Sequence, residues 1–348
     1  MPFNKIINIK KNNFDVLFRL YKPMLIVLLI CGYHFNFYKR NVIVTAVANV
    51  YCVTLVTGIV FATAVCCDAY YEISQAWSLI EYTVSVFIVL FSKTRTLFFF
   101  HKMSDIDCYL RINRRHYIST VYKLVIFVIV IWCVRIVYTY LYCVTYSCYN
   151  ILGLYAIKQF SLLALDLNRV WRCVLFDSIR YRLKILRIRL EQTPEYDFYL
   201  YVKGNKSMKE NKMKFCLYLY RSIADLVDIV SPDLQSSVSI LGPSSTTLLF
   251  IKSLGFVIMH VLQISLLLFS PFVAVEFYAV EVEKMRLNLM HRLIDQPDVE
   301  MFLRYTELRT FRYKIWRMIP INAALPLELI NLCTSYIIVV INFTHLYG

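Results

Sequence analysis

The sequence predicts an all-α, polytopic membrane protein, and three observations support this prediction. Of the 348 residues, 59% are hydrophobic and the mean hydropathy is +0.56, whereas soluble domains are about 45–50% apolar. The hydrophobic residues form several runs of about 20 residues, long enough to cross the ~30 Å hydrocarbon core as helices. Lys and Arg give the chain a net charge of +15 and stand between these runs. This distribution indicates that the basic residues orient the chain in the membrane and attract anionic lipids. We expect no nucleic-acid partner.

The first part of the chain predicts four spans. Residues 1–41 are basic, and their apolar stretch, Met24 to Ile30, is too short for a span, so we expect a cytoplasmic segment with an interfacial or partly buried helix. Spans one to four fall within residues 42–165. Their expected limits are Val42 to Cys66, Trp77 to Phe100, Tyr122 to Val144, and a fourth span that starts near Ile151.

The fourth helix is expected to continue into the cytoplasm as far as Gln192, because apolar residues recur there at helical spacing. Residues 166–232 would therefore form cytoplasmic anchor helices, the last of which Pro232 is expected to end. Residues 281–326 are a second basic segment and predict further cytoplasmic anchor helices.

The distribution of basic residues predicts the topology. Lys and Arg mark the cytoplasmic side, and they crowd the N-terminus, the loop after span two and the segment after span four, but are absent from the links after spans one and three. Residues 233–280 lie between two cytoplasmic segments and must cross twice or not at all. We predict spans five and six there, the fifth (234–254) short or incomplete because it holds Pro243, several serines and Lys252. With the last span at 327–348, this gives seven transmembrane helices in the plasma membrane, a cytoplasmic N-terminus and an extracellular C-terminus.

Two charged residues lie inside predicted spans, Glu81 in the second and Arg135 in the third. An unpaired charge in a membrane costs about 2.5–3.5 kcal/mol on insertion scales. We therefore expect each to form an ion pair or to face an aqueous pocket.

No enzyme, cofactor or metal site is predicted. The histidines have no Cys, His or acidic partner at ligand spacing, and the chain, with only seven glycines, has no P-loop, GxSxG or GxGxxG sequence. The cysteines within apolar runs are expected to be buried free thiols.

The last apolar run, Leu327 to Tyr347, carries polar residues on one stripe of the helix: Asn331, Ser335 and Asn342. Such a stripe either lines a water-filled path or forms hydrogen bonds between helices. The run contains Ser335-Tyr336, five apolar residues, and Asn342-Phe343. This pattern resembles the C-terminal signature of insect gustatory receptors, which is Thr-Tyr, five apolar residues and Gln-Phe. Here Ser335 replaces Thr, Asn342 replaces Gln, and Tyr336 and Phe343 match.

The resemblance implies a chemosensory receptor of the gustatory and odorant receptor superfamily: a ligand-gated, nonselective cation channel, assembled as a homo- or hetero-tetramer, whose pore is lined by the last helix of each subunit. It implies a constriction at Asn342 and Phe343, with Ile338, Val339 and Ile341 on the apolar part of the path. The alternative for Phe343 is packing against a neighbouring helix.

The resemblance also implies a pocket for a small-molecule tastant, expected to be bitter, in the outer half of the helix bundle. Aromatic residues with a few polar groups suit such a ligand, although Tyr and Trp also favour membrane interfaces. The candidate pocket residues are Glu81, Tyr82, Tyr138, Tyr142, Tyr155, Gln159, His260 and Gln263.

Two other functions stay open from the sequence. A secondary transporter would show inverted repeats and broken helices at the membrane midplane, and no such internal similarity is visible. A non-conducting or partner-dependent receptor subunit is suggested by the poor fifth span.

Overall fold

The structure is a computed structural model. It describes residues 3–35, 42–66, 72–91, 93–110, 112, 122, 126, 128–130, 132–137, 140, 152–192, 212–244, 254–291, 297–309, 314–315, 319–320, 331 and 335.

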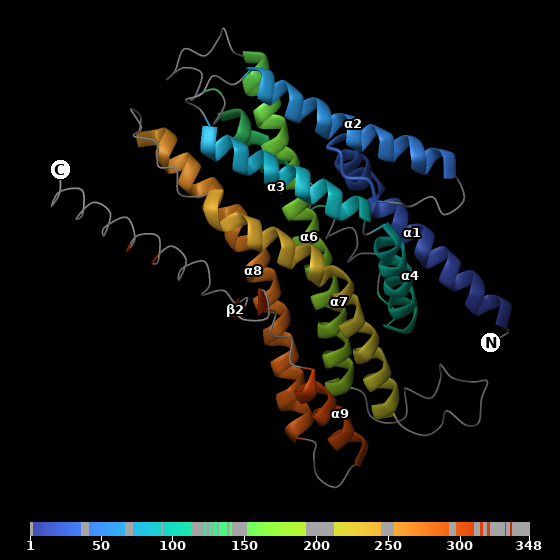
Figure 1. Ribbon diagram of the computed structural model, residues 1–348. Helices are drawn as coiled ribbons and strands as arrows, with labels where there is room; N and C mark the ends of the chain where they lie inside the picture. Colours follow the sequence, from blue (N-terminus) through green and yellow to red (C-terminus); the bar gives the residue numbers. More distant parts are fainter. Residues whose placement is uncertain are drawn as a thin grey trace.

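The described residues are almost all helical, with one pair of very short strands and a few turn residues (Figure 1). The helices are α1 (Phe3–Ile30), α2 (Val42–Cys66), α3 (Glu72–Phe91), α4 (Lys93–Leu110), α6 (Leu152–Gln192), α7 (Lys212–Ser244), α8 (Leu254–His291) and α9 (Pro297–Leu308). Strands β1 (Lys314–Ile315) and β2 (Ile319–Pro320) pair antiparallel. The prediction of an all-α chain is confirmed for this part, since the strands together hold four residues.

Three long helices run side by side along the molecule, with α6 packed against both α7 and α8 (Figure 1). The 41 residues of α6 form one unbroken helix, about 60 Å long at 1.5 Å per residue. The predicted helical continuation to Gln192 is therefore confirmed, and its cytoplasmic position stays a prediction. Helix α8 likewise continues unbroken to His291, well beyond the apolar part of its sequence.

Two predicted helix limits are wrong. The helix expected over Trp77 to Phe100 is divided, because α3 ends at Phe91 and α4 begins at Lys93. The helix expected to end at Pro232 continues to Ser244, through both Pro232 and Pro243. A proline removes one backbone donor, but a long helix can keep the remaining hydrogen bonds when its neighbours support it. Residues 245–253, part of the predicted fifth span, lie outside the described residues.

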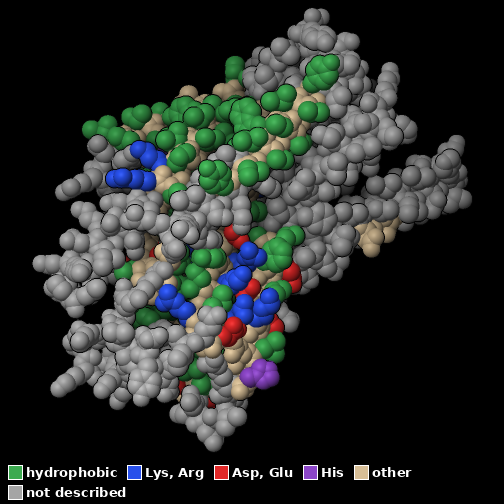
Figure 2. All heavy atoms as spheres, turned by 180° about the vertical axis from the view of Figure 1, so that it is seen from behind, with side chains coloured by type: hydrophobic (Ala, Val, Ile, Leu, Met, Phe, Trp, Pro, Cys, Tyr) green, Lys and Arg blue, Asp and Glu red, His purple; other side chains and the backbone are tan. Residues whose placement is uncertain are grey.

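Helix α2 is apolar on nearly all sides and is barely covered by the rest of the chain. In the described part of the chain it is the one helix long and apolar enough to cross a membrane, over Val42–Thr63, and 17% of that window is buried. Leu79–Phe91 and Val128–Val137 are shorter apolar helices. Figure 2 shows the resulting band of hydrophobic side chains, with most of the charged side chains gathered away from it. The exposed apolar residues of α2 include Val42, Ile43, Val47, Val50 and Phe61.

Helix α1 packs one face into the bundle and ends in a cap that α2 and α3 complete. Leu17, Tyr21 and Leu28 are buried against α4 and α6. Gly32 has φ 88° and lets the chain turn after the helix, with Tyr33 N donating to Leu28 O at 2.8 Å, the bond of a Schellman cap.

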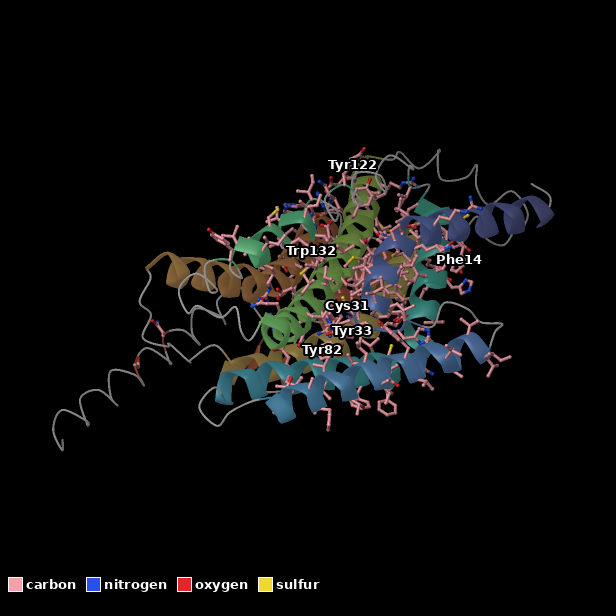
Figure 3. The ribbon with its side chains drawn as sticks, turned by 90° about the horizontal axis from the view of Figure 1, so that it is seen from above. Phe14, Cys31, Tyr33, Tyr82, Tyr122 and Trp132 are labelled. Atoms are coloured by element: carbon pink, nitrogen blue, oxygen red, sulfur yellow. The ribbon has the colours of Figure 1, made fainter. Side chains whose placement is uncertain are left out.

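Two tyrosine hydroxyls hold this cap in place. Tyr51 of α2 donates to Ile30 O and Tyr82 of α3 donates to Cys31 O, each at 2.9 Å. Figure 3 shows Cys31, Tyr33 and Tyr82 together at this junction.

Candidate functional site

Four charged side chains, three of them buried and the fourth, Arg169, partly buried, form a continuous chain of ion pairs between three helical segments. Arg135 Nη2 lies 2.5 Å from Asp166 Oδ2, and Arg169 Nη2 lies 2.5 Å from Glu81 Oε1. Arg169 also lies 3.7 Å from Asp166, which joins the two pairs. We call these four residues the charge network.

The secondary structure brings the members together. Asp166 and Arg169 are three residues apart on α6, so they share one face of the helix. Glu81 reaches this face from α3, and Arg135 reaches it from helical residues 132–137, in which Trp132 and Ile136 are exposed.

The network is electrically balanced, which accounts for its burial. Glu81, Asp166 and Arg135 are 3%, 1% and 9% exposed, and two carboxylates neutralise two guanidinium groups. Burying one of these charges without its partner would cost several kcal/mol. The expectation that Glu81 and Arg135 are paired is confirmed, but their partners are residues of α6.

Polar groups around the network retain unused hydrogen-bonding capacity. Arg135 Nη1 donates to Gln159 Oε1 at 3.5 Å, which turns the amide nitrogen of Gln159 away from the guanidinium. That nitrogen, Arg169 Nε and the fully buried Tyr33 hydroxyl have no hydrogen-bond partner among the described residues. Buried donors of this kind are met by internal water or by a polar group of a ligand.

Three of the eight predicted pocket residues meet at this site. Glu81 and Gln159 contact the arginines, and Tyr82, next to Glu81, is fully buried with its ring edge-on to Tyr33 at 6.0 Å. Because Glu81 is paired with Arg169 and the Tyr82 hydroxyl donates to Cys31 O, these two side chains act first as structural contacts.

The other predicted site residues stay predictions. Tyr155 lies in α6, and His260 and Gln263 lie in α8, but their side chains are not among those described; Tyr138 and Tyr142 lie outside the described residues. Ser335 is helical and exposed, as is Asn331 four residues earlier. The remaining motif and pore residues lie outside the described part: Tyr336, Ile338, Val339, Ile341, Asn342 and Phe343.

The sequence analysis missed Asp166 and Arg169 as site residues, because it placed the end of the fourth span at Leu165. The signal that could have found them is their spacing. An acid and a base three residues apart at a span boundary offer one partner each to Arg135 and Glu81.

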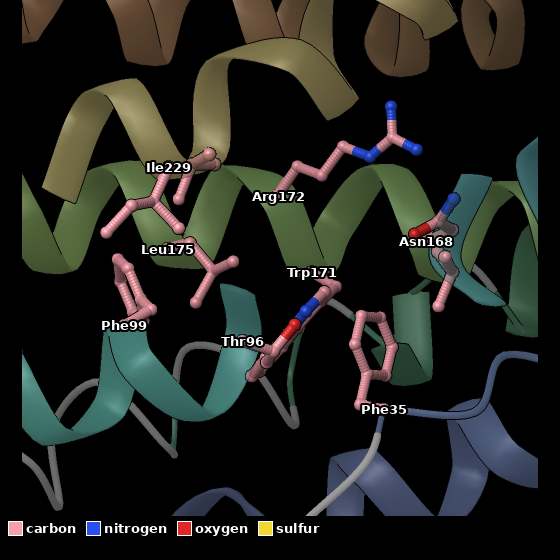
Figure 4. Close-up of a pocket in the computed structure, with 10 residues that line it drawn as sticks. Phe35, Thr96, Phe99, Asn168, Trp171, Arg172, Leu175 and Ile229 are labelled. Carbon is pink, nitrogen blue, oxygen red and sulfur yellow. The ribbon is translucent and has the colours of Figure 1, made fainter. Parts of the chain in front are cut away.

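A small cavity lies beside α6, between this helix and α3, α4 and α7 (Figure 4). It has a volume of about 20 Å³ and is lined by Phe35, Val89, Thr96, Phe99, Asn168, Trp171, Arg172, Leu175, Ile229 and Val230. The buried Trp171 Nε1 has no partner among the described residues. This space suits about one water molecule and is far below the ~300 Å³ that an organic ligand needs.

A second group of ion pairs joins α4, α7 and the end of α9. Asp225 accepts hydrogen bonds from Lys102 Nζ at 2.5 Å and from Arg309 Nη2 at 2.9 Å, and Arg309 also contacts Asp228. Burial by itself would raise the pKa of Asp225, but the hydrogen bonds and charges of Lys102 and Arg309 outweigh burial and lower it. We call these four residues the basal cluster. No group of His, Cys, Asp and Glu among the described residues is arranged to hold a metal ion.

Comparison with known proteins identifies this arrangement of helices. No known protein-family model matches the sequence, and no curated protein matches it. Among solved structures, the insect olfactory receptor OR5 from Machilis hrabei matches 94% of this chain and 99% of its own, with a TM-score of 0.59. The chain has the fold of this insect olfactory receptor. At 14% sequence identity the likeness establishes the fold alone.

Proposed function

We propose that the chain is a subunit of a chemosensory, ligand-gated cation channel of the insect olfactory and gustatory receptor superfamily. The observation that carries the proposal is the fold likeness to an insect olfactory receptor along almost the full length of both chains. The exposed apolar surface of α2 supports a place in the membrane, because an aqueous surface with so many large apolar side chains would be costly.

In this proposal the chain crosses the plasma membrane seven times with a cytoplasmic N-terminus, and α7 and α8 supply spans five and six. Their 33 and 38 residues correspond to about 50 and 57 Å of helix, enough for a span plus a cytoplasmic extension. The last helix of each subunit lines the pore, with the gate at Asn342 and Phe343.

The proposed ligand is a small organic molecule bound in the outer half of the bundle, above the charge network. Because Arg169 neutralises Glu81, this carboxylate does not serve as the counter-ion of a cationic ligand. The Ser335-Tyr336 and Asn342-Phe343 motif favours a tastant, whereas the fold is that of an olfactory receptor. A ligand panel therefore has to include alkaloids, sugars and volatile odorants.

The test is whole-cell current in cells that express the chain, alone and with candidate partner subunits. We expect a ligand-evoked, nonselective cation current whose gating or permeation changes in Phe343→Ala. The matched control is Phe61→Ala, because Phe61 is 68% exposed on α2 and would face lipid. An identical current in Phe343→Ala would remove the gate from this position. Ligand uptake without conductance would indicate a transporter, and silence at the cell surface with every partner would contradict the channel.

A further inference from the structure

Helix α1 presents a stripe that the bundle does not cover. Arg19, Lys22, Ile26 and Ile30 are exposed, and their spacing of three, four and four places them on one side of the helix. Leu17, Tyr21 and Leu28 are buried on the opposite side. The first two residues of the stripe are basic and the last two are apolar. We call these four residues the α1 stripe.

Hydrogen bonds between α1 and α2 fix the depth of this stripe. Tyr51 donates to Ile30 O, and His34 Nδ1 lies 2.9 Å from Asn49 Oδ1. Asn49 and Tyr51 stand seven and nine residues after the first residue of the apolar helix α2, which is about 10 and 13 Å along its axis. If α2 spans the membrane, the C-terminal end of α1 lies at the depth of the lipid chains.

The same measure places the basic half of the stripe at the membrane surface. Lys22 and Arg19 precede Ile30 by about 12 and 16 Å along α1, close to the level at which α2 begins. Figure 1 shows α1 extending from its contact with α2 toward that end of the molecule, and Figure 2 shows basic side chains at the border of the hydrophobic band. Lys39 and Arg40 also stand in the sequence shortly before α2, separated from it by Asn41, as expected at a cytoplasmic boundary.

The charges of the stripe have no partner within the described part of the protein. Neither Arg19 nor Lys22 forms an ion pair with any described residue, unlike Arg187, Arg286 and Arg304 of the cytoplasmic helices. Two unpaired basic side chains at headgroup level, followed by exposed isoleucines at acyl-chain depth, match the chemistry of a phospholipid with an anionic headgroup.

We propose that the α1 stripe binds an anionic phospholipid of the cytoplasmic leaflet, with Arg19 and Lys22 on its headgroup and Ile26 and Ile30 along its acyl chains. The inference rests on the membrane placement of α2 in the proposed function. It assigns a lipid, rather than a second copy of the chain, as the partner of this face, because basic and apolar residues occur in the order in which a leaflet presents phosphate and hydrocarbon.

The test is native mass spectrometry of the purified full-length chain in detergent, offered phosphatidylserine and phosphatidylcholine in equal amounts. We expect the wild type to retain phosphatidylserine preferentially, and the variant Arg19→Gln/Lys22→Gln to lose about tenfold or more of that preference. The control, Lys284→Gln/Arg304→Gln, removes two exposed charges that have acidic neighbours and should leave the preference unchanged.

Three results would overturn the inference: a preference that persists in Arg19→Gln/Lys22→Gln, an equal loss in the control variant, or a dimer of the chain that breaks up in Arg19→Gln/Lys22→Gln while lipid retention is unchanged. A chain that conducts but lacks the preference would overturn this inference alone. A chain that never enters a membrane would overturn the proposed function as well.

Discussion

Gly32 is the residue on which the end of α1 depends. Its φ of 88° costs a residue with a side chain about 1–2 kcal/mol, and an added Cβ would lie 2.8 Å from the Tyr82 hydroxyl. We expect Gly32→Ala to displace Tyr82, break its hydrogen bond to Cys31 O and lower the melting temperature of the detergent-solubilised protein. Fluorescence-detected size-exclusion chromatography of heated samples measures this melting temperature.

The control for this change is Gly58→Ala, within α2. A Cβ there meets nothing within 4 Å, and alanine is the better helix former by about 1 kcal/mol. This variant should melt at or slightly above the temperature of the wild type. Equal melting temperatures in the two variants would show that the turn at Gly32 does not fix α1.

The charge network predicts a non-additive pair of substitutions. Glu81→Gln leaves Arg169 without its closest carboxylate in a buried site, which costs about 3–5 kcal/mol when the remaining charge cannot reach water. Arg169→Gln should do similar damage through Glu81. The double variant keeps the site neutral, because Arg135 and Asp166 still pair, so we expect it to melt well above either single variant. Simple addition of the two losses would contradict the network.

The sequence predicted half of this network, and the reason is physical. Glu81 and Arg135 stand out because each is a lone charge within an apolar run. Asp166 and Arg169 stand in a segment rich in arginine, where the local pattern cannot distinguish a buried charge from one in water. Only the packing of α3 and helical residues 132–137 against α6 separates Arg169, 14% exposed at its side chain, from Arg180, 34% exposed.

At the scale of helices, the basal cluster fastens α4 and α7 to the end of α9. The pKa of Asp225 is lowered by Lys102 and Arg309, so its pairing stabilises the fold above the ordinary aspartate pKa of about 3.9 and is lost as the pH falls below that value. We expect the unfolding temperature of Asp225→Asn to lie below that of the wild type at pH 7, and the gap to close in acid.

Glu300→Gln is the control, because Glu300 is exposed and pairs only with the exposed Arg304 among the described residues. Its removal should change stability little at any pH. A gap between Asp225→Asn and wild type that stays constant down to about pH 3 would show that the pairing does not depend on the Asp225 charge.

The predictions of helix length are correct where apolar residues recur at a regular helical spacing. They are wrong where a proline interrupts this spacing, or where a helix ends without a proline or glycine. The unbroken α6 follows from residues that recur every three or four positions from Val170 to Ile179. Pro232 and Pro243 were expected to interrupt a helix, as prolines do in soluble proteins, yet α7 continues through both. The break between Phe91 and Lys93 has no proline or glycine to announce it, so only the structure reveals it.

At the scale of the whole molecule, the all-α fold class followed from composition and the long apolar runs, whereas the arrangement of helices did not. A hydrophobic run shows that a helix is long enough to span a membrane but not what it packs against. The position of α1 illustrates the gap, because its buried face depends on Tyr21 meeting Ser178 and Trp171, residues more than 140 positions away. The alternation of basic and uncharged loops likewise predicts on which side of the membrane each loop lies. The fold likeness does not test this prediction, so an experiment has to decide it.

The chain carries its own probes for that orientation. Asn205-Lys206-Ser207 is a glycosylation sequence in the basic loop 203–214, predicted to be cytoplasmic, so it should stay unmodified in eukaryotic cells. The other such sequence in the chain, Asn342-Phe343-Thr344, lies within the last predicted span, too close to the membrane to be modified. A third, added after Gly348 on a flexible extension, should be glycosylated because the C-terminus is predicted to lie outside. Enzymatic deglycosylation would then shift the mass of the tagged protein, and Asn205→Gln would leave the pattern unchanged. A shift that disappears in Asn205→Gln would place loop 203–214 outside. Because each predicted span crosses the membrane completely, every other loop and both termini would then also change sides, and the predicted topology would be reversed.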